Sequence, residues 1–296
     1  MCDPGGETPR WTLLLATCQS RPELTPSDTL LQQALERRGV RTVAMPWDRI
    51  DPGGLAGTVV CLRSTWDYHH RWPEFRDWLR RFAATPDRLW NAAETVLWNA
   101  DKRYLRELDA AGIRIPRTAW FEPALPLDLA RGFREIGARH GVLKPRVSAT
   151  AHGTCRVEAG TPPPAGAMTA IGEVGGLLQE FVPEIQDGGE LSLMFFDGAW
   201  SHAVRKVAAP GDFRVQSDFG GTWAPVDPPP ACVAFAARAL EAAGHPWVYA
   251  RCDLVETAGG PLLMELELIE PELFLTPAAA DRLAAALLRR LPAAPR

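Results

Sequence analysis

The sequence predicts a mixed α/β protein in which a parallel sheet layer is followed by antiparallel hairpins. Up to about residue 95, short β-rich runs alternate with helical patterns, which is typical of a parallel sheet covered by helices. Later in the chain, apolar runs are paired across Asp-Gly or Gly-Gly turns, which favours antiparallel strands. The 296 residues, 46% of them apolar, allow two or three packed units.

The first unit contains strands and helices in alternation. A strand is expected over residues 11–16, followed by a helix that Asp28 caps. Short strands are expected at residues 41–45 and 58–62. A second helix should begin at Pro73, with an aromatic stripe that faces the core rather than a ligand. The stripe consists of Phe75, Trp78, Leu79 and Phe82.

The second unit should begin with a helix that carries Lys102 and is capped by Asp101. A further helix is expected at residues 127–140. Two apolar strands should follow it, at residues 141–144 and 177–182. These elements predict a smaller sheet with its own helical cover.

The third unit is richer in strands. Two hairpins are expected, with a helix between them at residues 230–244 and a terminal helix capped by Thr276. The four hairpin strands are expected at residues 191–196, 200–207, 248–255 and 262–268.

Charge and motif content exclude several classes of function. The formal net charge of -4 and pI near 5.9 give no basic footprint, so neither nucleic acid nor a membrane is an expected partner. Residues 1–7 lack the features of a signal peptide, and we expect a cytoplasmic protein. The six cysteines show no metal-binding spacing, and Cys155 alone lies in a polar loop. Phosphate-loop, dinucleotide, hydrolase-elbow and zincin motifs are absent from the sequence.

Three acidic residues form the strongest candidate site. Glu265 and Glu267 alternate with leucines and so point to one face of their strand, and Asp253 lies on the partner strand of the hairpin. Carboxylates brought together among apolar neighbours repel one another, and Mg²⁺ would compensate that repulsion. A solvent-facing polar stripe explains the same pattern, so the residues alone leave both readings open.

Two lysines and a loop offer a second signal. Lys102 follows a helix cap, and Lys144 ends a strand before the small-residue loop at residues 147–154. Ammonium groups in these places could neutralise nucleotide phosphates while loop N–H groups close over them. An isolated lysine is more often simply solvated, and their order along the chain is what favours a nucleotide site.

Taken together, these segments resemble the ATP-grasp superfamily over nearly the whole chain. The similarity is to the branch with glutathione synthetase and the O-ureido-serine cyclo-ligase of cycloserine biosynthesis. The segments that carry it are residues 99–105, 142–145, 178–185, 213–221 and 264–271. The resemblance implies a Rossmann-like N-terminal domain at residues 1–98, a lid at 99–182 and a metal-binding subdomain at 183–296, the last two clamping ATP.

The resemblance also implies roles for individual residues. Nucleotide contacts would come from Lys102, Lys144, Ser148, Gly153, the adenine hinge Glu180, Phe181 and Val182, and the ribose-binding Glu190. Metal ligands would be Asp253, Glu265 and Glu267, for Mg²⁺ with Mn²⁺ as an alternative. Arg214 would steady the transferred phosphoryl group, helped by Arg205 or Lys206. The relatives usually have Asn at the position of Glu267. They also have a glycine-rich loop where residues 147–154 of this chain contain only one glycine, Gly153.

The substrate side is predicted from the loop after the strand at residues 58–62. Open α/β sheets bind ligands at such places, and the string resembles the cyclo-ligase branch. Arg63 or Ser64 would contact a carboxylate of an amino-acid-like substrate, with Trp66 and the Gly220-Gly221 pair nearby. Packing of the domain junction by Trp66 and Tyr68 is the alternative.

Three functions remain open at this point. The first is an ATP-dependent cyclo-ligase acting on an O-ureido-serine-like amino acid, through a phosphorylated carbonyl intermediate. The second is an intermolecular amino-acid or peptide ligase of the glutathione synthetase type. The third is an inactive nucleotide-binding regulator. Superfamily members often form dimers, so a homodimer is a further expectation.

Overall fold

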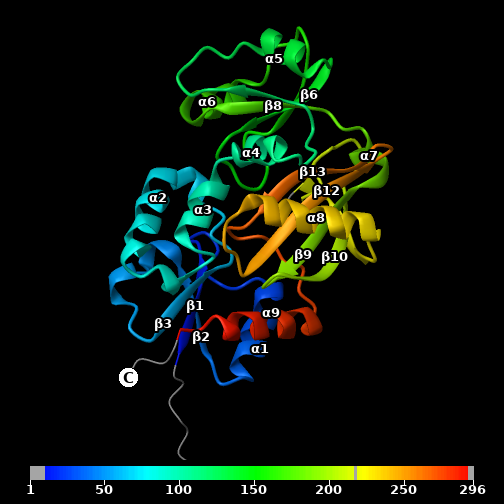
Figure 1. Cartoon of the computed structure of the whole chain (residues 1–296). Helices are drawn as coiled ribbons and strands as arrows, with labels where there is room; N and C mark the ends of the chain where they lie inside the picture. Colours follow the sequence, from blue (N-terminus) through cyan, green and yellow to red (C-terminus); the bar gives the residue numbers. More distant parts are fainter. Residues whose placement is uncertain (1–10, 217–218, 293–296) are drawn as a thin grey trace, which may run out of the picture.

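The chain folds around three sheets. The computed structural model describes residues 11–216 and 219–292. The predictions for residues 1–7, and Cys2 among them, lie outside that range. Figure 1 shows the small sheet with β6 and β8 above the sheet with β12 and β13, and the N-terminal sheet below and to the side. No helix among the described residues is long and apolar enough to cross a bilayer.

The N-terminal sheet is parallel, as the alternating pattern predicted, with strand order β2-β1-β3-β4. Its strands are β1 (Thr12–Thr17), β2 (Arg41–Pro46), β3 (Thr58–Leu62) and β4 (Leu89–Trp90), and its helices are α1 (Pro26–Glu36), α2 (Trp72–Arg80) and α3 (Ala93–Ala100). The predicted cap of α1 was wrong. Thr25 is the N-cap, because its Oγ1 accepts the Asp28 N–H at 3.0 Å, whereas Asp28 lies inside the first turn.

The predicted aromatic stripe of α2 faces the core. Phe75, Trp78, Leu79 and Phe82 are all buried, and Trp47 from the neighbouring loop packs against Phe75 at 5.0 Å between ring centroids. Trp78 satisfies its indole N–H by donating to the Ile50 carbonyl at 2.9 Å. The stripe is therefore a packing feature of this domain and not a ligand cage.

The smallest sheet has the order β5-β8-β6-β7, and all its pairs are antiparallel. Its elements are β5 (Thr118–Phe121), β6 (His140–Pro145), β7 (Cys155–Glu158), β8 (Gly176–Glu180), α5 (Leu129–Ile136) and α6 (Ala165–Val174). The sequence predicted no element over residues 167–176, so α6 was not expected.

The third sheet has the order β11-β10-β9-β12-β13 and contains both predicted hairpins. Its elements are α7 (Glu184–Gly188), β9 (Glu190–Phe196), β10 (Ala199–Val207), β11 (Thr222–Val226), α8 (Pro230–Ala243), β12 (Tyr249–Thr257) and β13 (Gly260–Glu267). The turn between β9 and β10 uses positive φ at Asp197 (48°) and Gly198 (86°), as an Asp-Gly turn requires.

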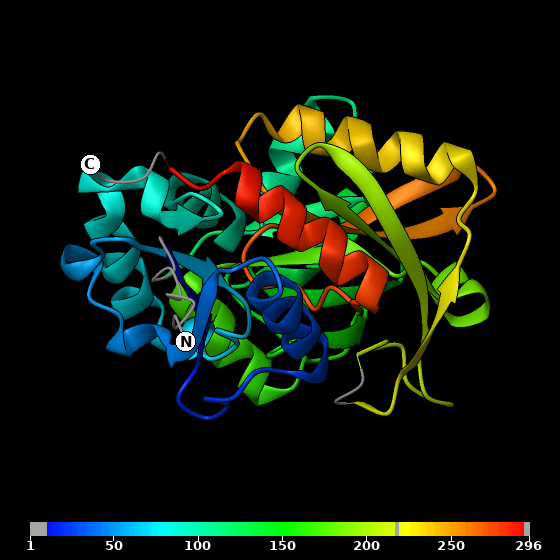
Figure 2. The same cartoon turned by 90° about the horizontal axis from the view of Figure 1, so that it is seen from below.

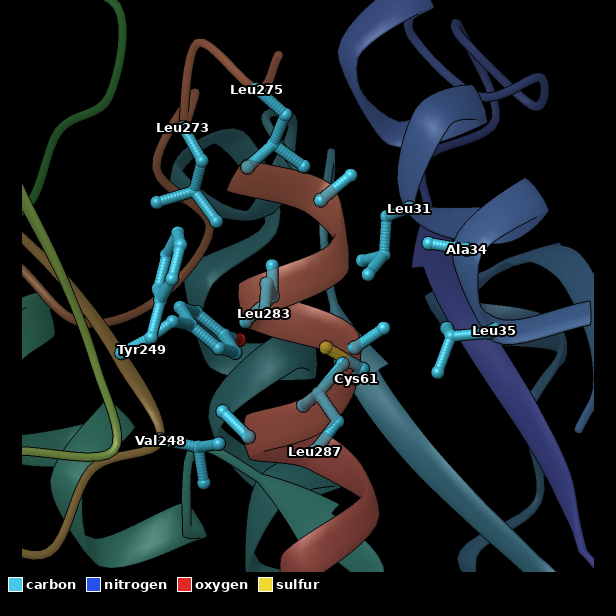
Figure 3. Close-up of a cluster of buried hydrophobic side chains, with 14 of the residues drawn as sticks. Leu31, Ala34, Leu35, Cys61, Val248, Tyr249, Leu273, Leu275, Leu283 and Leu287 are labelled. Carbon is cyan, nitrogen blue, oxygen red and sulfur yellow. The ribbon is translucent and has the colours of Figure 1, made fainter. Parts of the chain in front are cut away.

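The C-terminal helix α9 (Pro277–Arg289) joins the first and third sheets. Thr276 caps it as predicted, accepting the Ala279 N–H at 3.3 Å. Leu283 and Leu287 on α9 pack with Leu31 and Leu35 of α1, and Figures 2 and 3 show the two helices side by side. The same core includes Tyr249 of β12, so the sheet that carries the acidic residues is fixed to the N-terminal domain.

A second junction lies at the start of the predicted lid. Lys102 is in the turn between α3 and α4 (Tyr104–Ala110), and not on a helix that Asp101 caps. Asp101 instead accepts the Arg103 N–H at 3.0 Å and pairs with Arg146. Tyr104 on α4 belongs to the core of the third sheet, so this turn is held against β13.

Candidate active site

A cavity of about 410 Å³ opens where the three sheets meet. Trp66 lines it from the loop after β3, Lys144 from β6, and Asp253 from β12. Its size falls in the range of small-molecule sites, which is roughly 300–1,000 Å³. Of the candidates from the sequence, the residues that line it are Trp66, Lys102, Lys144, Ser148, Glu180, Phe181, Val182, Glu190, Lys206, Arg214, Asp253, Glu265 and Glu267.

The acidic residues occupy neighbouring places on the β12–β13 hairpin. Asp253 is directly opposite Glu265 in the antiparallel register, and Glu267 is opposite Arg251. All four line the cavity, because residues two apart on a strand share a face. Asn99 holds this edge in place, donating to the Leu266 carbonyl and accepting the Leu268 N–H, each at 2.7 Å.

Each of the three carboxylates is paired with a cation. Lys102 Nζ lies 2.9 Å from Glu265, and Lys206 Nζ lies 3.3 Å from Asp253. Arg251 donates to Asp253 at 2.8 Å and also pairs with Glu267. Burial alone would raise the pKa of Asp253, but Arg251 and Lys206 outweigh it and hold that pKa below its usual range.

Two carboxyl groups on the other side of the acidic group, Glu267 and Glu270, have raised pKa values. Burial, reinforced by Asp253 and Glu265 against the opposing Arg251, raises the pKa of Glu267 to about 7. Burial and then Glu267 raise the pKa of Glu270 to about 8. Carboxylates crowded in this way fit a divalent cation, since hard oxygen donors are what Mg²⁺ prefers and a cation would remove their repulsion.

The phosphate side of the cavity combines Lys144 with Lys102. Lys144 Nζ donates to Gln179 Oε1 at 2.7 Å, and Lys102 Nζ donates to the Ser148 carbonyl at 3.1 Å. Burial lowers the pKa of Lys144 despite the nearby Glu265. The buried ammonium group of Lys144 is therefore well placed to bind an anionic ligand in the cavity.

The loop between β6 and β7 closes over the same side without the usual glycines. Thr150 and Ala151 line the cavity and take φ values of 49° and 54°, a left-handed conformation that glycine adopts more readily. Gly153 also has positive φ, 68°, but does not line the cavity, and an added Cβ would lie 2.7 Å from Pro145. Gly153 therefore shapes the loop, and its predicted direct contact stays a prediction.

The predicted hinge lies at the end of β8. Glu180, Phe181 and Val182 line the cavity in succession, and the Glu180 side chain is held by Arg117 at 2.6 Å. Glu190, at the start of β9, is buried and forms an ion pair with Lys206 at 2.5 Å. Burial raises the pKa of Glu190, and Lys206 partly offsets this.

The structure separates Arg205 from Lys206, its neighbour on β10. Lys206 faces the carboxylates, whereas Arg205 points to the other face, where it pairs with Glu256 at 2.8 Å and does not line the cavity. The predicted help from Arg205 is thus not supported by its position. Arg214 lines the cavity and pairs with Asp212 at 2.7 Å.

The glycines after Arg214 and the first two residues of the Trp66 loop do not line the cavity. A Cβ at Gly221 would lie 2.3 Å from the Val215 carbonyl oxygen, and Gly220 has φ 78°, so both shape the backbone. Arg63 is buried and pairs with Asp28 at 2.7 Å, and Ser64 is buried beside it. The position of Arg63 does not support the predicted substrate contact, because its guanidinium donates to Asp28 and to the Pro271 carbonyl.

Comparison with known proteins decides the family. Residues 13–91 match the family model of the D-cycloserine synthetase DcsG N-terminal domain. Cycloserine biosynthesis protein DcsG of Streptomyces lavendulae is 32% identical over 284 residues, which cover 88% of this chain and 92% of that protein. This chain belongs to the DcsG family. It is an ATP-grasp ligase, as the order of lysines, hinge and carboxylates predicted.

Solved structures agree on the fold. The crystal structure of D-cycloserine synthetase DcsG matches with a TM-score of 0.79 at 29% identity, covering 94% of this chain and 99% of that one. D-alanine--D-alanine ligase of Bacillus anthracis matches with a TM-score of 0.66 at 13% identity, covering 95% and 96%. At that identity the second match concerns the fold alone.

Several residues of this DcsG family site were missed by reasoning from the sequence. Arg251 holds two carboxylates, and Gln179 and Ser192 hold Lys144 and Asp253. Arg251 could have been predicted from the sequence, because it lies two residues before Asp253 and so on the same strand face. Gln179 and Ser192 sit in buried strands whose pairing the sequence does not reveal.

Proposed function

We propose that this DcsG family ligase closes the ring of an O-ureido-serine-like amino acid, forming an isoxazolidinone at the expense of ATP. The observation that carries the proposal is the single cavity where Lys102, Lys144 and the three carboxylates meet the Trp66 loop. The relative named for cycloserine biosynthesis aligns with 88% of this chain. The cavity is bounded on the Trp66 side by Arg21, Tyr68 and Glu272.

In the proposed reaction, the substrate carboxylate takes the γ-phosphoryl group of ATP and ADP leaves. The ureido nitrogen bonded to oxygen then attacks the acyl carbon, and phosphate leaves with the carboxylate oxygen. Water removes the carbamoyl group as carbon dioxide and ammonia. Positioning and charge stabilisation dominate catalysis in phosphoryl transfer, so the residues needed are cations and metal ligands.

We assign the phosphate contacts to Lys102 and Lys144, whose ammonium groups face the cavity from two sides. Lys206 and Arg214 would stabilise the transferred phosphoryl group, and Arg251 would hold Asp253 and Glu267 in position for it. The backbone of residues 180–182 would bind adenine, and Glu190 the ribose. Ser148 would contribute through its loop.

Asp253, Glu265 and Glu267 would hold Mg²⁺, or Mn²⁺ in its place. When bound, the metal would neutralise charge on the phosphate oxygens. The gathering of Glu267 and Glu270 with the other carboxyl groups along the cavity supports this assignment. Glu267 supplies an oxygen ligand, as the usual Asn would, and adds a negative charge.

The test is to incubate purified protein with ATP, Mg²⁺ and O-ureido-serine of each hand. ADP, phosphate and the isoxazolidinone should appear in equal amounts. Mass spectrometry measures the isoxazolidinone, and a phosphate-release assay measures the phosphate. The Glu265→Gln variant should lose turnover by about 100-fold or more, because a ligand that balances phosphoryl charge is removed. Phosphate release only with pairs of amino acids would favour an intermolecular ligase and reject the cyclo-ligase.

Three coarser expectations join this proposal. We propose domain boundaries near residues 98 and 182, supported by the separate sheets on either side of each. We also propose a homodimer and a cytoplasmic location, the first from the habit of the superfamily and the second from the similarity to a cycloserine biosynthesis protein. Sedimentation of the purified protein tests the dimer.

A further inference from the structure

Three histidines meet beside the active-site cavity and have no role in the proposed reaction. His69 and His70 lie in the short 3-10 helix Tyr68–Arg71, which follows the Trp66 loop of the N-terminal domain. His152 comes from the loop between β6 and β7, about 80 residues later in the chain. One ring nitrogen from each can be chosen so that all three lie within 4.8 Å of one another.

The three imidazoles face one another closely. The ring centroids are 3.9 Å apart for His69 and His70, 4.7 Å for His70 and His152, and 5.1 Å for His69 and His152. Both ring nitrogens of His69 are buried and have no hydrogen-bond partner of normal geometry among residues 11–216 and 219–292. Buried polar atoms of this kind normally have a partner, so the group is chemically incomplete.

We propose that His69, His70 and His152 bind a divalent transition-metal ion, Zn²⁺ in the first instance, and that this ion clamps the β6–β7 loop to the N-terminal domain. Three imidazoles are a common ligand set for zinc, which leaves a fourth position for water. Two nitrogens bound to one zinc ion at about 2.0–2.1 Å lie roughly 3.4 Å apart, which small side-chain rotations can reach from 4.8 Å.

The protonation state of the cluster suits a metal. Burial, and next the neighbours His70 and His152, lower the pKa of His69 to about 3. Burial and then His70 lower the pKa of His152 as well. Neutral imidazoles are the metal-binding form, so at neutral pH His69 binds a metal without first releasing a proton.

A metal ion bound by the three histidines would affect the active-site cavity, because both segments that carry them also line it. Ala151 precedes His152 in the loop and lines the cavity, and Tyr68, which precedes His69, lines it from the N-terminal domain. A metal held by both segments would keep the loop closed over bound nucleotide. Zn²⁺ would therefore slow nucleotide exchange without occupying the carboxylate site. Metal binding itself does not depend on the proposed reaction.

The experiment is calorimetric titration of the full chain with Zn²⁺ in the presence of excess Mg²⁺ and ADP, which occupy the other metal site. We expect one equivalent to bind, with the affinity falling at least about tenfold in His152→Ala and in His70→Ala. His140→Ala, a change at an exposed histidine on β6 outside the cluster, should bind as the wild type does. His70 and His152 are exposed, so these variants should keep the wild-type melting temperature.

Hydrogen–deuterium exchange supplies a second readout that distinguishes a clamp from binding elsewhere. Zn²⁺ should slow exchange in peptides that cover residues 68–71 and in those that cover residues 147–154, and His152→Ala should remove both effects. Wild-type affinity in His152→Ala and His70→Ala would overturn the proposal. Tight binding with no protection of either segment would overturn it equally, and neither result would touch the ligase assignment.

Discussion

Replacing Arg63 by Met should reduce stability far more than it affects substrate binding. The side chains of Arg63 and Asp28 are 1% and 2% exposed, and their ion pair is 2.7 Å long. Burial alone would lower the pKa of Arg63, but Asp28 outweighs it and raises that pKa above its ordinary value. Arg63→Met leaves Asp28 as a buried charge without its partner, which typically costs about 3–5 kcal/mol.

The expected loss converts into a measurable change in melting temperature. Each kcal/mol shifts the midpoint of a chain of this size class by about 2–4 °C, so the fall should be on the order of 10 °C. Differential scanning calorimetry measures it, and the KM for the amino-acid substrate is measured on the same sample below the transition. The KM should stay within about threefold of the wild type, because Arg63 does not line the cavity.

The double variant Asp28→Asn with Arg63→Met is the matched control. It removes both charges and keeps an oxygen that can accept the Thr25 hydroxyl, now 3.1 Å from Asp28. Replacing both members of a buried pair is far less costly than removing one, so the double variant should regain at least half of the lost temperature. A tenfold rise in KM with an unchanged melting temperature in Arg63→Met would refute this reasoning and restore a substrate role.

Two further predictions concern charged residues of the cavity. Lys206→Met should lower kcat by about 100-fold or more, because it removes a cation that faces the carboxylates. Its neighbour Arg205 lies on the other strand face, so Arg205→Ala should keep kcat within about twofold of the wild type, and equal losses in the two variants would contradict the assignment. The metal-free protein should melt at a lower temperature at pH 8 than at pH 6, because folded Glu267 and Glu270 keep their protons up to pKa values of about 7 and about 8, whereas the unfolded chain releases them near 4.5. Glu267→Gln should reduce that slope and leave the part that comes from Glu270, and a slope unchanged by the substitution would rule out Glu267 as one of its sources.

The sequence predicted most of the fold because local signals there agree with tertiary packing. Alternating strands and helices, the Asp197-Gly198 turn and the Thr276 cap are all local patterns with a definite backbone geometry. It failed at α6, where Gly166 and Gly172 weaken the helical pattern of the segment. It also failed at Asp28, a good cap residue by type whose carboxylate is instead required by Arg63 across 35 positions.

The residues of the candidate site likewise divide into those whose place the sequence predicted and those whose place it did not. The sequence predicted that the β12–β13 hairpin brings Asp253 near Glu265, but their direct pairing depends on a register shift between Asp253 and Leu254 that alternation does not reveal. The roles of Arg63 and Arg205 could not, because a cation's function depends on which buried partner lies within reach. Glu256 and Asp28 occupy those two arginines, and neither pairing has a local signal in the sequence.

The pairing of charges in the ligand-free site explains how one set of residues can serve both nucleotide and metal. Lys102 pairs with Glu265 here, although the first is assigned to phosphate and the second to Mg²⁺. Separate binding of either ligand would leave one of the two without a partner in a half-buried site, which is costly. Joint binding of the metal and the nucleotide lets both exchange partners at once. The geometry therefore favours entry of ATP together with its metal ion.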